Sequence, residues 1–162
     1  LLSECIAVLK DKNAAGLSIK EENIPAFIKD FTYVVDNQMA EEACQPKIEI
    51  STQARLDDFT DQVYRILKLL GPFGPLNLRP VFLSHKCQVV EGPVIIGKNH
   101  LKMKVRQGEA VFETIGFNLG EKMSEIKGTG SFIDLVYQLD ENYWNGKTTI
   151  QLRLKDLRKH ID

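Results

Sequence analysis

The spacing of apolar residues divides the chain into two parts that meet near residue 76. In the first part, two stretches repeat an apolar residue every three or four positions, which is the period of an amphipathic helix. These stretches predict helices over residues 23–39 and 57–70. In the second part, residues 77–162, apolar and polar residues alternate. A period of two is typical of strands with one buried face.

Shorter patterns surround the two predicted helices. Residues 1–9 have the apolar spacing of the end of another amphipathic helix. Residues 14–19 form an apolar run that predicts a short buried strand. Residues 46–54 predict a further strand, with Ile48 and Ile50 on one face. We therefore expect helices and strands to be mixed in the first part of the chain.

Residue types at the helix ends support these assignments. Asn23 can cap the first predicted helix, and Pro25 is compatible with its first turn because no intrahelical hydrogen bond is lost there. Asp57 or Asp58 begins the second helix, since a carboxylate suits the positive end of the helix dipole. Gly71-Pro72 then ends this helix.

The alternating pattern of the second part predicts five strands, at residues 80–90, 93–106, 110–118, 131–140 and 147–156. The second of these contains a possible break at Lys98-Asn99. A short helix over residues 120–126 separates the third strand from the fourth, and Asn145-Gly146 is a strong signal for a tight hairpin turn. Five strands with a helix between the third and the fourth is the arrangement of an OB (oligonucleotide-binding) barrel.

The composition is that of a soluble globular protein, with 43% hydrophobic and 27% charged residues. No apolar run approaches the roughly 20 residues that cross a bilayer, so we expect no membrane partner. Cys5, Cys44 and Cys87 are far apart and form no C-x-x-C pair, which indicates reduced thiols and a cytoplasmic protein. The chain begins with Leu1 rather than Met, and we expect it to be a piece of a longer protein.

Charge is unevenly distributed, although the net charge is only −1. Residues 1–76 carry 8 basic and 12 acidic side chains, whereas residues 77–162 carry 13 basic and 10 acidic ones. The sign of the charge therefore changes where the apolar spacing changes. Such an asymmetry indicates that the two parts have different roles.

A segment rich in proline and glycine joins the two parts. Residues 70–80 contain three prolines and two glycines, which end a helix and lead into a strand through a rigid joint. This segment, Leu70-Gly71-Pro72-Phe73-Gly74-Pro75 with Asn77 and Arg79-Pro80-Val81-Phe82, resembles the connector of the RecJ family of single-strand-specific DNA exonucleases. Residues 14–19 with Glu21-Glu22-Asn23, and the closing residues 150–158, resemble the same family.

The resemblance implies an α+β fold in which the end of a DHH-associated domain precedes a five-stranded OB-fold β-barrel. The expected boundaries are residues 1–45 for the DHH-associated part, 46–76 for a strand-helix connector and 77–162 for the nucleic-acid-binding barrel. The resemblance also implies a parent exonuclease that degrades single-stranded DNA from the 5′ end in recombination and repair. Its Mg²⁺ or Mn²⁺ would be held in a catalytic domain upstream of this chain, which we expect to be inactive alone.

The second predicted strand makes the best physical case for nucleic-acid binding. Alternation turns Leu101, Met103 and Val105 toward the core and places the intervening cations outside, roughly 7 Å apart, which is close to the phosphate repeat of an extended single strand. The last strand repeats this pattern. The predicted binding cations are Lys98, Lys102, Lys104, Arg106, Arg153 and Lys155. Alternatively, these cations only keep the strands soluble and prevent edge pairing.

Single-strand grooves also use aromatic rings on which bases stack, at about 1–3 kcal/mol each. Phe117 ends a predicted strand and Trp144 adjoins the hairpin turn, so both are candidate stacking residues. Trp144 could equally close the bottom of the barrel. Phe73 and Phe82 flank the joint, and we expect them to be packing anchors.

The sequence predicts no catalytic residue and no metal site in this chain. His85, His100 and His160 have none of the D-H-H or H-x-x-x-H spacings of a two-metal phosphoesterase. We expect His100, which precedes the basic strand, to be solvated. The family carries a Gly-Gly-His segment where this chain has only residues 9–13. Either that contact is lost or residues are missing from the sequence, so no site residue is carried over there.

Two other functions stay open at this point. OB barrels also dock proteins, so this barrel could bind a repair partner or a single-strand-binding protein instead of DNA. The fluorescence of Trp144 would separate these two functions, because stacked bases quench it. The chain could also belong to a DHH phosphodiesterase that acts on short nucleotides, although such substrates do not need an extended groove.

Overall fold

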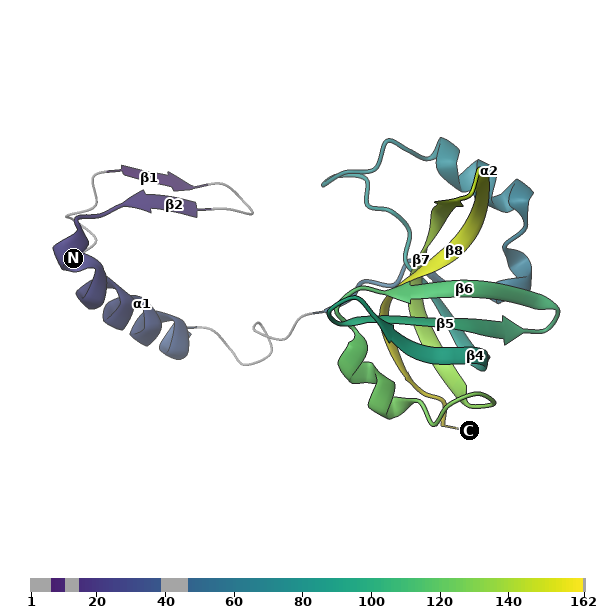
Figure 1. Cartoon of the computed structure of the whole chain (residues 1–162). Coiled ribbons are helices and arrows are strands. Elements are labelled where there is room, and N and C mark those ends of the chain that lie inside the picture. The colour runs from purple at the N-terminus through teal and green to yellow at the C-terminus, as the bar shows by residue number, and fades with distance from the viewer. Residues whose placement is uncertain (1–6, 11–14, 39–46, 162) are drawn as a thin grey trace. The chain divides into compact units, whose positions relative to one another are not determined.

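The computed structural model describes residues 7–10, 15–38 and 47–161, and the chain divides into two compact units, Leu1–Lys47 and Ile48–Asp162 (Figure 1). No helix within the described residues is long and apolar enough to cross a membrane.

The first unit contains a small hairpin and one long helix. Strand β1 (Ala7–Lys10) pairs antiparallel with β2 (Ala15–Ser18), and the 3₁₀ turn η2 (Glu21–Asn23) leads into helix α1 (Ile24–Gln38). The helix predicted for residues 1–9 is therefore wrong for residues 7–9, because pairing with β2 gives this short segment the backbone hydrogen bonds that a helix would have supplied. Residues 1–6, and the predicted helix end at Met39, lie outside the described residues.

The second unit is a closed five-stranded barrel. Its strands are β4 (Phe82–Ile96), β5 (His100–Gln107), β6 (Ala110–Gly116), β7 (Phe132–Trp144) and β8 (Lys147–Lys159). They lie in the order β4-β5-β6-β8-β7, and pairing of β7 with β4 closes the sheet. The 3₁₀ helix η5 (Gly120–Glu125) separates β6 from β7. The predicted OB fold, with its helix between the third and fourth strands, is confirmed.

The boundary between the first two barrel strands differs from the prediction. We expected the first strand to end at residue 90, but β4 continues through Gly92-Pro93 to Ile96. The chain turns at residues 97–99, where the possible break at Lys98-Asn99 was predicted. The register with β5 shifts twice around Gly92, whose φ of 81° is open to glycine alone without strain. Glycine and proline here mark bulges that bend one long strand around the barrel.

The connector before the barrel is more irregular than predicted. The strand expected at residues 46–54 is reduced to β3 (Thr52–Gln53), which runs parallel to β4. The 3₁₀ turn η4 (Leu56–Asp58) and helix α2 (Asp61–Leu69) follow. The residue that caps α2 is Thr60, whose Oγ1 accepts a hydrogen bond from the N–H of Val63 at 3.3 Å, and not Asp57 or Asp58.

Connector and barrel share one hydrophobic core. Leu56 is fully buried, and Phe59 packs against Phe82 and Tyr137 with ring centroids 4.9 and 6.0 Å apart. The buried core also contains residues from β4, β5, β7 and β8, among them Val89, Leu101, Val105, Leu135 and Leu152, and the partly buried Phe112 of β6 packs against it. Segment 48–76 is thus part of the barrel's folding unit.

Candidate nucleic-acid interface

The barrel register places the predicted cations of β5 and β8 on one face. Lys102 of β5 pairs with Ile115 of β6, which in turn pairs with Arg153 of β8. Residues that pair directly across neighbouring strands point to the same side of a sheet. The basic rows of β5 and β8 therefore lie on the same outer face, with β6 between them. At about 4.8 Å per strand, the two rows are roughly 10 Å apart.

Alternation within β5 is as predicted. Leu101, Met103 and Val105 are buried in the barrel, at 0%, 2% and 0% exposure. Lys102 and Lys104 are half-exposed between them. Because these three apolar side chains point into the core, the lysines between them lie on the outer face of β5.

Each cation of β5 has a polar neighbour on the adjacent strand. Lys104 contacts the carboxylate of Glu91 at 2.6 Å, and Lys102 lies 3.6 Å from that of Glu113. Arg106 donates to the side-chain amide of Gln88 at 2.6 Å. The hydrogen bond and charge of Glu91 raise the pKa of Lys104. The carboxylates reduce the positive field of the row, which the sequence pattern alone did not reveal.

The other predicted cations make fewer or longer contacts with carboxylates. Lys98 is exposed in the turn between β4 and β5, and Lys155 is exposed on β8. In the part of the chain that the structure describes, neither forms an ion pair shorter than 4 Å. Arg153 lies 4.0 Å from a carboxylate oxygen of Asp140. The row on β8 is therefore freer to meet an anion than the row on β5.

Phe117 forms a small aromatic and cationic cluster on this face. The guanidinium of Arg153 lies over its ring at 5.1 Å, and the ring of His100 meets its edge at 5.1 Å. Because the N–H of Asn118 donates to Nδ1 of His100 at 3.2 Å, that nitrogen is an acceptor. His100 is thus held in the cluster rather than only solvated as expected. Phe117 remains 48% exposed, which leaves ring surface for a stacking partner.

Trp144 ends β7 beside the Asn145-Gly146 turn, as predicted. Its side chain lies outside what the structure describes. Its role as a stacking residue stays a prediction.

A groove of about 680 Å³ adjoins the basic rows, between the β5–β6 hairpin and the β7–β8 hairpin. Lys102, Val111 and Glu113 line one side. Asn142, Lys147 and Thr149 line the other. Lys147 was missed by the sequence analysis, although its position directly after the hairpin turn could have indicated it. The groove is open to solvent, with Lys102 on one side and Lys147 on the other.

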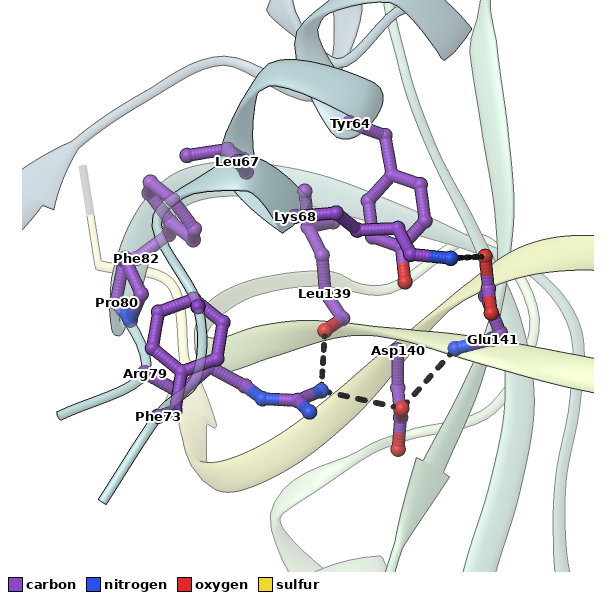
Figure 2. Close-up of a pocket in the computed structure, with 11 residues that line it drawn as sticks. Tyr64, Leu67, Lys68, Phe73, Arg79, Pro80, Phe82, Leu139, Asp140 and Glu141 are labelled. Carbon is purple, nitrogen blue, oxygen red and sulfur yellow. Dashed lines mark hydrogen bonds and ion pairs between the residues drawn. The ribbon is translucent and has the colours of Figure 1, made fainter. Parts of the chain in front are cut away.

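A second hollow, of about 250 Å³, lies where the joint packs on the barrel (Figure 2). Arg79 stacks on Phe73 at 5.5 Å and donates to the carbonyl of Leu139 and the carboxylate of Asp140, both at 3.2 Å. Lys68 of α2 pairs with Glu141 at 2.8 Å. Phe82, 6% exposed in the core, is a packing anchor, as expected. Phe73 is half-buried beside Arg79, and the charged pairs tie the joint and α2 to β7.

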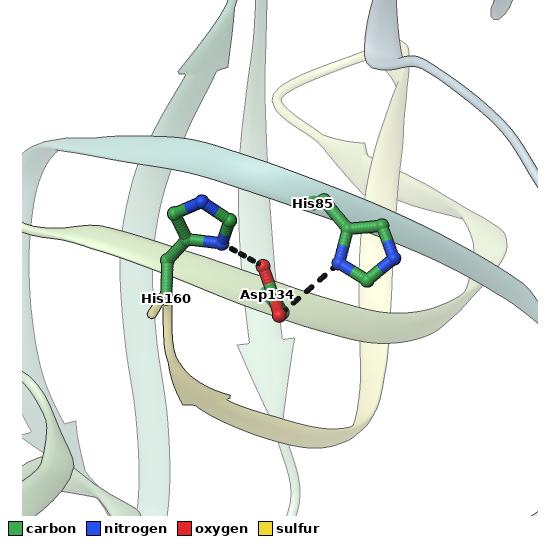
Figure 3. A group of neighbouring side chains, drawn as sticks. All are labelled: His85, Asp134 and His160. Atoms are coloured by element: carbon green, nitrogen blue, oxygen red, sulfur yellow. Dashed lines mark hydrogen bonds and ion pairs between the residues drawn. The ribbon is translucent and has the colours of Figure 1, made fainter. Parts of the chain in front are cut away.

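A third cluster was not foreseen at all. His85, Asp134 and His160 place their ligand atoms within 4.8 Å of one another (Figure 3). One carboxylate and two imidazoles do not fit a pair of Mg²⁺ or Mn²⁺ ions, which need several oxygen ligands.

Comparison with known proteins identifies the family. A family model described as RecJ OB domain matches residues 50–156. The single-stranded-DNA-specific exonuclease RecJ of Bacillus subtilis (strain 168) is 33% identical over 161 residues, which cover 96% of this chain and 20% of the relative. The RecJ of Haemophilus influenzae is 29% identical over 154 residues, which cover 92% and 26%. The chain thus spans about a quarter or less of the length of these relatives.

The fold comparison agrees. A crystal structure of RecJ from Thermus thermophilus, in complex with Mn²⁺, matches 99% of this chain and 23% of that chain, with a TM-score of 0.68 and 22% identity. At this identity the likeness concerns the fold. The family match over residues 50–156, which covers the barrel and most of its connector, decides the assignment: the chain belongs to the RecJ family and carries its OB domain.

Proposed function

We propose that the outer face of β5, β6 and β8 binds single-stranded DNA, and that the chain does so as the C-terminal region of a RecJ-like exonuclease acting 5′ to 3′ in recombination and repair. The observation that carries the proposal is the barrel register, which aligns two basic rows on either side of β6. The relatives are named as single-stranded-DNA-specific exonucleases, which supports the same function.

The ion pairs on this face are compatible with binding. Pairs such as Lys104 with Glu91 are solvent-accessible, and exposed pairs typically contribute only 0–1 kcal/mol. A phosphate can therefore replace the carboxylate at small cost. Phe117 and Trp144 supply rings for bases, while Lys98, Arg153 and Lys155 contact phosphates.

The catalytic step belongs elsewhere in the parent protein under this proposal. The Mg²⁺ or Mn²⁺ and the residues that hold it lie in a catalytic domain that this chain does not contain. The role of this chain is to hold the strand, in the cytoplasm, while the catalytic domain cleaves it. The end of a DHH-associated domain, residues 1–45, would link the two.

Titration of fluorescently labelled oligo-dT tests the binding role. If about four phosphates are neutralised, affinity falls roughly fiftyfold between 50 and 200 mM salt. Absence of binding at low salt would remove the proposal.

A matched pair of variants then locates the contact. Lys102→Ala with Lys104→Ala should weaken binding equally for oligo-dT and oligo-dA, since phosphates carry no sequence. Lys127→Ala with Lys159→Ala also removes two charges, but from a separate hollow beside Phe132, and should leave affinity unchanged. Equal losses in both variants would mean that only overall charge matters.

A protein-docking role is the second candidate. The surface near the joint exposes three leucines, Leu69, Leu76 and Leu78, at 82%, 102% and 68%. Such apolar exposure favours a repair partner or a single-strand-binding protein. Trp144, the single tryptophan, separates the two roles. Quenching by oligo-dT supports DNA binding, whereas quenching by a protein partner alone supports docking.

A further inference from the structure

A β-bulge in β4 is built around one acidic residue of β7. Between Ser84 and Cys87 the register of β4 with β7 shifts, so that His85 and Lys86 lie opposite the single residue Asp134. Two residues facing one is the defining count of a bulge. Bulges re-aim side chains and are common beside functional sites.

The bulge has an unusual backbone. Lys86 has a φ of 52°, the left-handed region that residues other than glycine seldom occupy. This conformation directs its N–H to Oδ1 of Asp134 at 3.1 Å. It also allows the ring of the preceding residue, His85, to turn toward the same carboxylate. The strained conformation of Lys86 thus places its own N–H and the ring of His85 against the carboxylate of Asp134.

Three side chains converge at this point (Figure 3). Nδ1 of His85 lies 3.1 Å from Oδ2 of Asp134, and Nδ1 of His160 lies 2.7 Å from Oδ1. The three come from β4, from β7 and from the residue after β8. The N–H of His160 donates to the carbonyl of Phe132 at 3.0 Å, which fixes the backbone of this last ligand.

The carboxylate is buried but remains charged. The side chain of Asp134 is 5% exposed, that of His160 16% and that of His85 35%. Burial alone raises the pKa of Asp134, but hydrogen bonds from the Lys86 N–H, from both histidines and from Arg158 outweigh it and lower the pKa to about 2. Arg158 contributes through Nε, 3.1 Å from Oδ2, on a side chain that is 70% exposed.

We propose that His85, Asp134 and His160 form a binding site for one divalent cation of the zinc class, held by the two Nδ1 atoms and the carboxylate. Ligand atoms of one zinc ion, at bond lengths of about 2.0–2.2 Å, are roughly 3–4 Å apart. The three atoms here are at most 4.8 Å apart, so small rotations of the imidazoles suffice. The proposal is independent of DNA binding.

The donor set selects the metal. Two imidazole nitrogens and one carboxylate suit Zn²⁺, Co²⁺ or Ni²⁺, whereas Mg²⁺ prefers oxygen ligands in an octahedron. A water molecule completes the coordination, because the described residues supply three ligands. The Lys86 N–H and Arg158 stay on the carboxylate as outer partners that orient it.

The site has a structural consequence. Asp134 is near the start of β7 and His160 follows β8, so the site lies at the opposite end of these strands from the Asn145-Gly146 turn. A bound ion would join the end of the described chain to β4 and β7. It would stabilise the native barrel, since the unfolded chain brings these ligands together only rarely.

Calorimetric titration with ZnCl₂ tests the site on the full chain without an affinity tag. Cys5 and Cys44 are first changed to Ser, so that thiols do not compete. Cys87 needs no change, because burial raises the pKa of its thiol to about 12. We expect one Zn²⁺ per chain, a higher melting temperature with Zn²⁺, and no saturable binding of MgCl₂. Failure of the chain to bind one Zn²⁺ would overturn the proposal.

Variants assign the ligands. His85→Asn and His160→Asn should each lower the Zn²⁺ affinity at least tenfold. Loss of an outer-shell partner alone typically lowers metal affinity by about tenfold or more, and a direct ligand should matter at least as much. His100 is the one other histidine of the chain, so His100→Asn is the matched control, and its Zn²⁺ affinity should equal that of the unchanged protein. An equal loss in all three variants would indicate surface binding and contradict the site.

A measurement on unchanged histidines covers the case in which a variant fails to fold. Long-range ¹H–¹⁵N spectra of the side chains report which ring nitrogen binds the metal. Zn²⁺ should shift Nδ1 of His85 and of His160 and leave both nitrogens of His100 in place. Shifts at Nε2, or at His100 alone, would overturn the proposal.

Discussion

The carboxylate of Asp57 joins two segments that are distant in the sequence. It accepts the N–H groups of Ala110 and Glu109, at 2.9 and 3.0 Å, and the guanidinium of Arg55 at 3.0 Å. The turn between β5 and β6 is thereby tied to η4. Gly108 belongs to this turn with a φ of 61°, and a Cβ there would collide with the Asp57 carboxylate.

This arrangement predicts a pH-dependent contribution to stability. Hydrogen bonds from Ala110 and Arg55 lower the pKa of Asp57 below its ordinary value of 3.8. A lowered folded-state pKa stabilises the protein above pH 3.8, and the contribution is lost as the pH falls through the folded-state value. Asp57→Asn should therefore reduce the melting temperature at pH 7, with a difference from the unchanged protein that narrows below about pH 4. Asp61→Asn, which removes the same charge from α2 without breaking a hydrogen bond to the β5–β6 turn, is the control and should lower the melting temperature less at pH 7.

Phe117 provides a prediction about binding at the same scale. Loss of a stacking ring typically costs about 1–3 kcal/mol. Phe117→Ala should therefore weaken oligo-dT binding by that amount in an anisotropy titration. Phe132, on β7, is similarly exposed, at 44% against 48%, and Phe132→Ala is the matched control. If the two changes have equal effects, Phe117 does not stack on bases.

Residue-scale interactions also explain what the sequence could not predict. His85, Asp134 and His160 have no motif spacing; the bulge in β4 and the pairing of β7 with β8 bring them together. The partner of Asp57 is likewise set by tertiary packing, whereas the pattern suggested a helix cap. Side-chain pairs between distant segments leave no periodic signal.

At the scale of elements, the connector and the barrel depend on each other. The alternation of β5 predicted its buried and exposed faces, because its apolar side chains are stable only in the barrel core. The pattern indicated the turn at Lys98-Asn99, but it also predicted a strand end before Gly92-Pro93, which has the composition of a turn and yet forms part of a bulged strand. The helix predicted near the N-terminus failed because a four-residue segment is too short for its period to be decisive.

Because Leu56 of the connector is buried in the barrel core, we expect the connector and the barrel to unfold together. Removing a fully buried leucine side chain typically costs about 2–5 kcal/mol. Leu56→Ala should lower the free energy of unfolding by this amount in urea titrations followed by circular dichroism. Leu69→Ala, on α2 but 82% exposed, should change it by less than about 0.5 kcal/mol. A small effect of Leu56→Ala would mean that the connector folds separately from the barrel.

At the scale of the whole molecule, the net charge of −1 does not show that basic side chains are concentrated on one face of the barrel. The basic rows of β5 and β8 share one face because the barrel closes in the order β4-β5-β6-β8-β7. The strand pattern alone predicted each row, but their common side follows from the parallel pairing of β6 with β8. The neighbouring carboxylates Glu91 and Glu113 moderate the field, so binding should depend on the arrangement of charges more than on their sum.

NMR mapping can locate the bound DNA on the barrel. Oligo-dT is added to the ¹⁵N-labelled chain at low salt, and the shifts of backbone amides are followed. If DNA binds to the outer face of β5, β6 and β8, the largest changes occur along the outer rows, at residues 102–106, 115–117 and 151–155, and at the Asn145-Gly146 turn. Changes confined to α2 and η5, or none at saturating oligo-dT, would contradict binding at this face.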